Sequence, residues 1–353
     1  MADFSKEDIR AAVASGLINE AQAVGLITLA QERLGVRDGM TGEDEPFEFF
    51  KGFSEIFVTV GLWLLLGGMI AFGAVIGGVF GISLFGMILT WVFALYFTKK
   101  RRMNLPSMSL AAGFGLFLAA MVMSIFDKTG NSFDESSLMF TAIIGMVGML
   151  IYYRVFKLPF TMFIFGLFAL TLIYALMGKQ GTDVPLFGFS DAMFNLSKNS
   201  GFATGSLIFG VLAFALGIYF DTKDPHRISR YSATGFWLHI LAAPALVNTM
   251  ALTLYNSGGS KAYLLTALLL FFVMILSLVI DRRSFLTAGI GYLGALIGWV
   301  FSNNMSDGGS MVATLLILGA FITALGTWWV QIRAWLMRLL PDFPYKSRFP
   351  PYN

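Results

Sequence analysis

Residues Phe80–Arg102 read FGISLFGMILTWVFALYFTKKRR, and this stretch decides the fold. No Asp, Glu, Lys or Arg interrupts positions 80–98, a length close to the roughly 20 residues with which a helix crosses the hydrocarbon of a bilayer. A run of cations from Lys99 to Arg102 follows directly. An uncharged apolar block that ends in a cationic turn is typical of a membrane-spanning helix whose loop stays on the side of synthesis.

The same pattern recurs along the chain from Ile56 to Ile332, and it predicts ten spanning helices. Their expected positions, all free of Asp, Glu, Lys and Arg, are 56–77, 80–98, 107–126, 136–153, 158–177, 202–220, 233–255, 262–280, 284–301 and 311–332. The loops between them are short, so we expect an all-α polytopic membrane helix bundle. The boundary after the first block is the least marked, because Gly77 to Gly81 offers no polar turn, and a re-entrant pair there would shift the count by two.

Composition agrees with a membrane protein. Hydrophobic residues make up 57% of the chain and charged residues 13%, whereas about a quarter of an average soluble domain is charged. Cysteine is absent, which excludes disulfides, thiolate metal sites and cysteine nucleophiles. The net charge of +3 comes from uneven loops and not from one basic patch, so nucleic acid is not an expected partner.

Cations between the blocks predict the orientation. If the amino terminus is cytoplasmic, the inside segments hold 20 Lys and Arg and the outside loops hold 4. Positive residues resist translocation, so both termini should face the cytoplasm. The chain then divides into a cytoplasmic helical hairpin (1–35), a tether and interfacial segment (36–55), a ten-helix transmembrane domain (56–332) and a cytoplasmic amphipathic, Pro-rich tail (333–353).

The polar amino-terminal segment has the pattern of a helical hairpin. We expect helices over 6–15 and 20–34, with Asn19 and Gln22 placed as a capping box before the second and Gly16 as the left-handed residue after the first. Such a pair buries too little surface to be stable alone. It should therefore dock onto the membrane domain, onto a second copy or onto another protein.

Glycines at four-residue spacing predict close contacts between spanning helices. Gly73, Gly77 and Gly81 form one such series, and Gly294 and Gly298 form another. Small residues at this spacing let two helix backbones approach where lipid gives no hydrophobic drive for association.

Polar residues inside the blocks are few, and the seventh block holds His239, Pro244 and Asn248. A histidine in a span can gate on protonation, or it can hydrogen-bond to a neighbouring helix beside the proline kink; the second interpretation is favoured. Asn248 lies about 180° from His239 by helical phase, so the two need not share a site. Asn248 itself is expected to link helices by hydrogen bonds.

The loop from Asp221 to Arg230 is the densest polar cluster between blocks. Carboxylate and imidazole groups of this loop could in principle hold a divalent metal, namely Asp221, Asp224 and His226. The interleaved Lys223, Arg227 and Arg230 would repel a cation. A salt-bridged loop, or a site for anionic lipid headgroups or a partner, is the favoured interpretation.

The stretch from Phe236 to Pro244, together with Gly16-Leu17-Ile18 and Gln22-Ala23, resembles a family of uncharacterised bacterial inner-membrane proteins. Members of that family place a short helical hairpin before a multi-pass domain. The resemblance implies residence in a bacterial plasma membrane, and it implies no activity, cofactor or catalytic residue.

Two classes of function fit these features, and the first, a permease, is favoured. Ten spans with both termini inside suit a five-plus-five permease, here for a neutral or lipid-like solute because the blocks hold no acid. The alternative is a non-catalytic scaffold, assembly or sensor protein that binds a partner through its hairpin and tail. No nucleophile elbow or paired histidines appear, so neither enzyme activity, a catalytic residue, a metal nor a cofactor is expected. A polar cavity lined by His239 would favour the permease, and solid packing around it would favour the scaffold.

Overall fold

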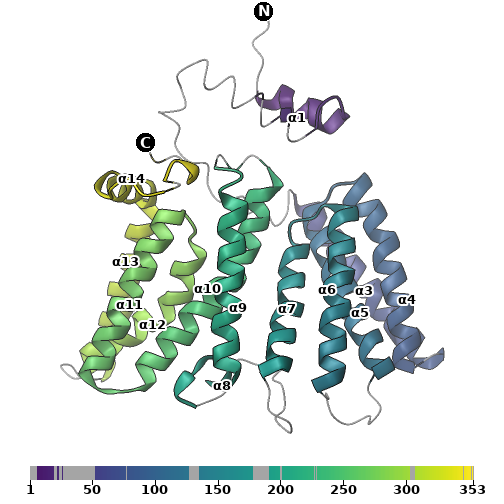
Figure 1. Cartoon of the computed structure of the whole chain (residues 1–353). Coiled ribbons are helices and arrows are strands. Elements are labelled where there is room, and N and C mark those ends of the chain that lie inside the picture. The colour runs from purple at the N-terminus through teal and green to yellow at the C-terminus, as the bar shows by residue number, and fades with distance from the viewer. Residues whose placement is uncertain are drawn as a thin grey trace, which may run out of the picture.

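The computed structural model describes residues 6–19, 22–23, 26, 52–76, 78–126, 135–177, 191–198, 201–225, 227, 229–302, 307–344, 346–350 and 352. Within these ranges the chain is all-helical and holds no β-strand (Figure 1). The helices that overlap the predicted blocks are α3 (Phe53–Ile76), α4 (Gly78–Ala94, continued by the π-helix η2, Leu95–Lys100), α5 (Asn104–Phe126), α6 (Glu135–Phe156), α7 (Thr161–Met177), α9 (Gly201–Asp221), α10 (Arg230–Asn256), α11 (Gly259–Ile280), α12 (Ser284–Ser302) and α13 (Asp307–Thr327).

Length and hydropathy identify a multi-pass membrane protein. Seven of the described helices are long and apolar enough to cross a bilayer, while the apolar stretches of α7 and α12 are shorter. The predicted last block, 311–332, does not form one helix. The chain bends by 73° between α13 and α14 (Trp329–Leu339). The bend arises because Trp329 and Arg333 of α14 bind Asp281 at the end of α11.

The helices form two groups of five that meet along α7. Helices α3 to α7 pack in sequence in the first group, α9 to α13 form the second, and α7 contacts both α9 and α10. The short helices α8 (Asp191–Phe194) and η3 (Leu196–Lys198) lie between the groups along the chain. Each group has its own core. An aromatic cluster of Trp91, Tyr152 and Phe156, with ring centroids 4.3 to 5.6 Å apart, lies in the first.

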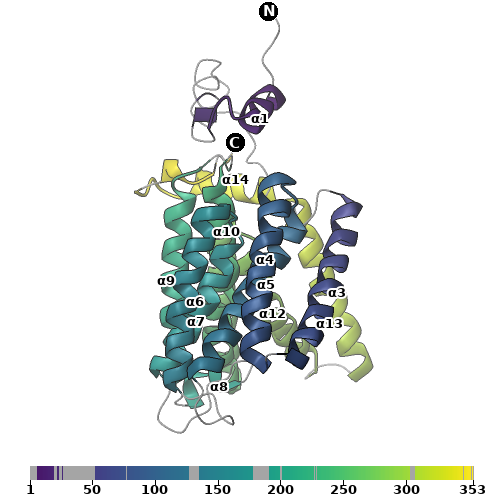
Figure 2. The same ribbon diagram turned by 90° about the vertical axis from the view of Figure 1, so that its right-hand side faces the viewer.

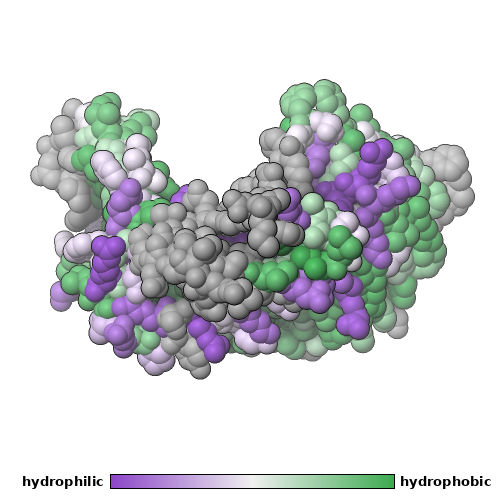
Figure 3. All heavy atoms as spheres, turned by 90° about the horizontal axis from the view of Figure 1, so that it is seen from above, coloured by the Kyte–Doolittle hydropathy of each residue, from purple (hydrophilic) through white to green (hydrophobic). Residues whose placement is uncertain are grey.

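The two groups flank a hollow. Helices α3 and α13 lie far apart across the width of the bundle in Figure 1, and Figure 2 shows that both lie on the same face of the molecule. Seen from the end that carries the carboxyl terminus, the surface is hollowed between two largely hydrophobic lobes (Figure 3).

The outer surface of the bundle exposes apolar side chains, for example Leu64 on α3 and Leu316 on α13. A surface in contact with lipid needs such side chains.

The cationic turns gather at one end of the bundle. Arg230 donates to the carbonyl of Lys157 at 3.4 Å, which joins the α9–α10 turn to the α6–α7 turn. At the same end of the first group, Glu55 of α3 accepts hydrogen bonds from the backbone N–H groups of Asn104 and Leu105 at 3.0 and 3.1 Å. A carboxylate at a helix N-terminus satisfies donors that the helix leaves free, so Glu55 caps α5.

The described part of the amino-terminal segment agrees with the predicted hairpin. Helix α1 covers Lys6–Ser15 as expected, and Gly16 has the left-handed φ of +80°. The backbone N–H groups of Asn19 and Gln22 each donate to the other residue's side chain at 2.9 Å, which confirms the capping box. The rest of the second helix, predicted over 20–34, and the tether lie largely outside the described residues.

Glycine contacts differ between the two predicted series. A Cβ on Gly294 would lie 3.2 Å from Leu318, and one on Gly298 would lie 3.7 Å from Thr314, so this series faces α13. A Cβ on Gly81 would meet nothing within 4 Å. Gly73 and Gly77 lie outside the residues whose surroundings the structure describes. Tight contacts also occur at glycines outside both series, among them Gly145 against Phe168.

This difference predicts opposite effects for two alanine substitutions. Gly145→Ala should lower the stability by about 1–3 kcal/mol, because its methyl group would overlap the Phe168 ring and overpacking of a filled interface carries that cost. Gly81→Ala should leave the stability unchanged or raise it by up to about 1 kcal/mol through helix propensity. Thermal unfolding of the two purified variants in detergent would test this, and equal melting temperatures would contradict it.

Candidate functional site

A buried carboxylate and guanidinium form the centre of the candidate site. Asp221, the last residue of α9, accepts from Arg282 Nη2 at 2.5 Å and from Arg282 Nε at 3.0 Å. Arg282 is 1% exposed and is the largest fully buried side chain of the described residues. Its Nη2 also donates to the Ser232 carbonyl at 3.0 Å. Two nitrogens of the planar guanidinium thus bind the two oxygens of the carboxylate, the bidentate arrangement that makes such pairs strong. The pair joins α9, α10 and the α11–α12 turn.

His239 also binds Asp221. We call Asp221, Arg282, Ser232 and His239 the first node of a buried polar network. The Nε2 of His239 lies 2.9 Å from the second carboxylate oxygen of Asp221. Its ring is fully buried, packs edge-on against Phe214 and Phe285 at centroid distances of 5.6 and 5.7 Å, and rests on Gly217, where a Cβ would lie 2.7 Å away. The ring Nδ1 has no hydrogen-bond partner. The histidine is therefore packed on all sides rather than facing a polar cavity.

Asp281 forms a second node one residue before Arg282. Its carboxylate accepts from the indole N–H of Trp329 at 2.7 Å and pairs with Arg227 at 3.1 Å. Arg333 lies 3.7 Å from the same carboxylate and donates to the Leu278 carbonyl at 3.0 Å. Trp329 and Arg333 both belong to α14, so these contacts hold α14 across the end of α11 and explain the bend after α13.

Local backbone geometry presents Asp281 and Arg282 to the network. Asp281 follows the last residue of α11 with a left-handed φ of +55°, and its own carbonyl accepts from Arg227. The N–H of Arg282 donates to the Ser277 carbonyl at 3.0 Å, while the Ser277 hydroxyl donates back to the Arg282 carbonyl at 2.6 Å. Aspartate tolerates the left-handed region better than most residues. The turn therefore directs consecutive side chains, Asp281 and Arg282, into two different nodes.

The α9–α10 turn is fixed by a third acid. Asp224 accepts from the N–H and the hydroxyl of Ser229, both at 2.7 Å, and Ser229 is the N-cap of α10. Gly217 and Gly235 let α9 and α10 approach, since a Cβ on Gly235 would overlap the Asp221 carboxylate. Small residues at this crossing are thus a condition for the buried pair.

The carboxyl-terminal tail folds back over the second node. Arg333 Nη2 donates to the Pro350 carbonyl at 2.7 Å, and the Arg333 guanidinium lies 6.0 Å from the centre of the Tyr352 ring. Phe349 packs against the core of the second helix group. Lys346 donates to the Leu340 carbonyl at 2.8 Å. In this conformation the tail closes the end of the bundle where the ion pairs lie.

The residues predicted from the seventh block lie apart. Pro244 stands inside α10, which continues as one helix from Arg230 to Asn256. Asn248 is half-buried, nine residues along α10 from His239 and about 180° away by helical phase. Only His239 joins the network, and it binds α9, in line with the favoured interpretation of an interhelical hydrogen bond.

The three predicted loop cations also have different surroundings. Arg227 is buried against Asp281, and Arg230 is half-buried beside Lys157. Lys223 is exposed, with its ammonium 4.1 Å from the centre of the Tyr219 ring. A hydrogen bond with Tyr219 raises the pKa of Lys223. Of the three, Lys223 has the surface position that a lipid headgroup or partner requires.

The network joins several helices through paired charges and hydrogen bonds. Every acid of the network faces an arginine, a histidine or a backbone donor, and no group of three or more His, Cys, Asp or Glu that could hold a metal occurs among the described residues. Buried charges must be paired and hydrogen-bonded to be tolerated. In this network Asp221 and Asp281 are each paired with an arginine, and Asp224 is hydrogen-bonded to Ser229.

A separate cavity lies between α11, α12 and α13. It has a volume of about 190 Å³, and its lining consists of apolar residues. The lining contains no member of the ion-pair network. A polar substrate would find no hydrogen-bonding side chain there.

No protein-family model matches the chain, and neither does a curated protein or a solved structure.

A double-mutant cycle would test the central pair. Asp221→Asn or Arg282→Gln alone should each lower the stability by about 3–5 kcal/mol, because each leaves a buried charge without its partner. The double variant should lose less than the sum, since neighbouring groups are not additive. The measurement is unfolding of the purified protein in mixed detergent, with Asp342→Asn, an exposed carboxylate, as the control. Additive losses would contradict the pairing.

The tail contact predicts a change in protease sensitivity. Arg333→Gln removes the charged donor to the Pro350 carbonyl, so trypsin should cleave after Lys346 or Arg348 faster than in the parent chain. Arg338→Gln, an exposed change on the same helix, is the matched control and should cleave at the parent rate. Mass spectrometry of timed digests measures both, and an unchanged rate in Arg333→Gln would show that this hydrogen bond does not hold the tail.

Proposed function

We propose that this chain is a non-catalytic scaffold, assembly or sensor protein of a bacterial inner membrane. In this proposal it crosses the membrane ten times, with both termini in the cytoplasm, and it binds a protein partner through its amino-terminal hairpin. The gathering of cationic turns at one end of the bundle supports that orientation.

The packing around His239 is the observation that carries the proposal. A permease needs a cavity that the solute can enter from either side of the membrane. His239, the one ionisable side chain predicted within the blocks, is fully buried between Phe214, Phe285 and Gly217. Fixed ion pairs on four helices favour a rigid platform over a moving carrier.

The hairpin offers the surface for a partner. Leu17 is 81% exposed and Leu26 is 48% exposed, while Ala23 between them is buried. Exposed leucines on a cytoplasmic segment are not covered by lipid, and apolar side chains of this kind often lie at the centre of protein interfaces. The capping box at Asn19 and Gln22 orders the chain between them.

Two observations favour the second candidate, a permease for a neutral or lipid-like solute. The groups α3–α7 and α9–α13 run in opposite senses: α3 starts at the end of the bundle where Glu55 caps α5, whereas α9 finishes at that end with Asp221. Opposed halves are common in transporters. The cavity between α11 and α12 is apolar, as a lipid-like solute would need.

Purification in mild detergent separates the two candidates. A partner that co-purifies in stoichiometric amount should bind at least about tenfold less to the full-length double variant Leu17→Asp, Leu26→Asp, because loss of central apolar contacts costs about 2 kcal/mol or more. Ala14→Ser, another exposed position of the hairpin, should retain it. Quantitative mass spectrometry of the eluates measures both.

Two outcomes would count against the scaffold. One is an eluate without a stoichiometric protein partner. The other is solute flux by the partner-free protein in liposomes, which would make transport the better proposal.

A further inference from the structure

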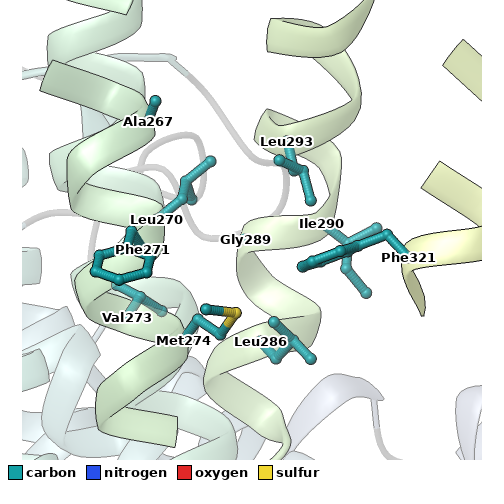
Figure 4. Close-up of a pocket in the computed structure, with 10 residues that line it drawn as sticks. All are labelled: Ala267, Leu270, Phe271, Val273, Met274, Leu286, Gly289, Ile290, Leu293 and Phe321. Carbon is teal, nitrogen blue, oxygen red and sulfur yellow. The ribbon is translucent and has the colours of Figure 1, made fainter. Parts of the chain in front are cut away.

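The cavity between α11, α12 and α13 has the chemistry of hydrocarbon. Figure 4 shows side chains from all three helices around it, with Leu270 and Phe271 on α11, Ile290 on α12 and Phe321 on α13. Met274 supplies a flexible thioether at one side. A lining of this kind excludes a polar or charged ligand, because no partner would replace its lost hydration.

The cavity has its opening on the lipid-facing side of α11. Phe271 lines the cavity and is itself 52% exposed, and Ala267, one helical turn away, is also exposed. The adjacent outward residue Phe272 is 65% exposed. In a spanning helix such surfaces meet acyl chains, so a chain can enter from the side without crossing a polar layer.

Gly289 helps to create the space. It lines the cavity, and a Cβ on it would lie 3.1 Å from Leu270 Cδ2, a distance tighter than an ordinary contact. The volume of about 190 Å³ is below the roughly 300–1,000 Å³ of sites that enclose a whole drug-sized ligand. It suits a segment of a long chain whose remainder stays in the bilayer.

The depth of the cavity selects the leaflet. Its α12 lining runs from Leu286 to Leu293, in the first half of a helix that starts at Ser284 beside the cationic α11–α12 turn. Arg283 stands one helical turn before Leu286. A lipid whose chain fills the cavity would therefore have its phosphate near the level of that turn, where basic residues attract anionic headgroups.

We propose that this cavity is a binding site for one acyl chain of a phospholipid from the leaflet next to the cationic turns. An apolar cavity of comparable size stays dry and takes up apolar molecules, and a bilayer supplies acyl chains at the highest concentration. The bound chain would fill the space between α11 and α12, next to the end of the bundle that holds the ion-pair network. The site is independent of the hairpin, so its failure would leave the proposed partner binding untouched.

Photo-crosslinking of the full-length protein in nanodiscs tests the site. The probe is a phosphatidylglycerol with a diazirine in one acyl chain, and peptide mapping locates the adducts. Peptides that contain Ala267–Met274 or Leu286–Leu293 should be labelled above the exposed leucines of α13. Ala267→Phe, which fills the cavity from its exposed mouth, should lower that labelling at least about tenfold, equivalent to about 1.4 kcal/mol of binding free energy.

Two controls make the result decisive. Ala71→Phe, the same change at an exposed position of α3, should leave the labelling of α11 and α12 unchanged. A free fatty acid with the same diazirine distinguishes the source of the chain, and labelling by the fatty acid without labelling by the phospholipid would overturn the proposal. Labelling of α11 and α12 no higher than that of α13, or unaffected by Ala267→Phe, would also overturn it.

Discussion

The bidentate contact between Asp221 and Arg282 is the interaction on which the second helix group depends. Asp221 ends α9, Ser232 and His239 belong to α10, and Arg282 lies between α11 and α12, so one carboxylate and one guanidinium fix four helices at a single point. Asp281 extends the same polar layer to α14 and the tail. Burying a charge costs desolvation free energy unless an opposite charge and hydrogen bonds compensate for it. The contacts on every side of this pair are what permit it.

Much of the fold could be predicted from the sequence, because block length and charge are physical requirements of a bilayer. Phe80–Arg102 illustrates this: the apolar stretch is helical to Lys100, and the chain turns at Arg101 and Arg102. The bend at the end of the tenth block could not be predicted. Residues 329–332 are as apolar as a span, and they leave the axis of α13 because Trp329 and Arg333 bind Asp281, a contact between residues about 50 positions apart.

The site was only partly accessible to sequence reasoning. The sequence predicts a hydrogen bond from His239 to a neighbouring helix, and the structure contains one, but the sequence places its partner Asp221 in the polar loop after α9. Cations between the blocks indicate orientation and do not reveal the role of the acids, although Asp221 and Asp281 each directly follow an apolar block at the cationic end. An acid in that position is a usable signal. Which arginine it binds depends on how the helices pack, and spacing along the chain does not contain that information.

The elbow at Trp328 limits how the protein adapts to membranes of different thickness. A spanning helix usually meets a thicker or thinner bilayer by tilting, but α13 is bent by 73° into a helix that the ion pairs hold in place. The central helix α7 has 17 residues, about 26 Å of axial rise, against a hydrocarbon layer of about 30 Å. Helix α7 packs between the two helix groups, so the place where thickness matters is α13, and the lipids beside that helix must adapt where its tilt cannot.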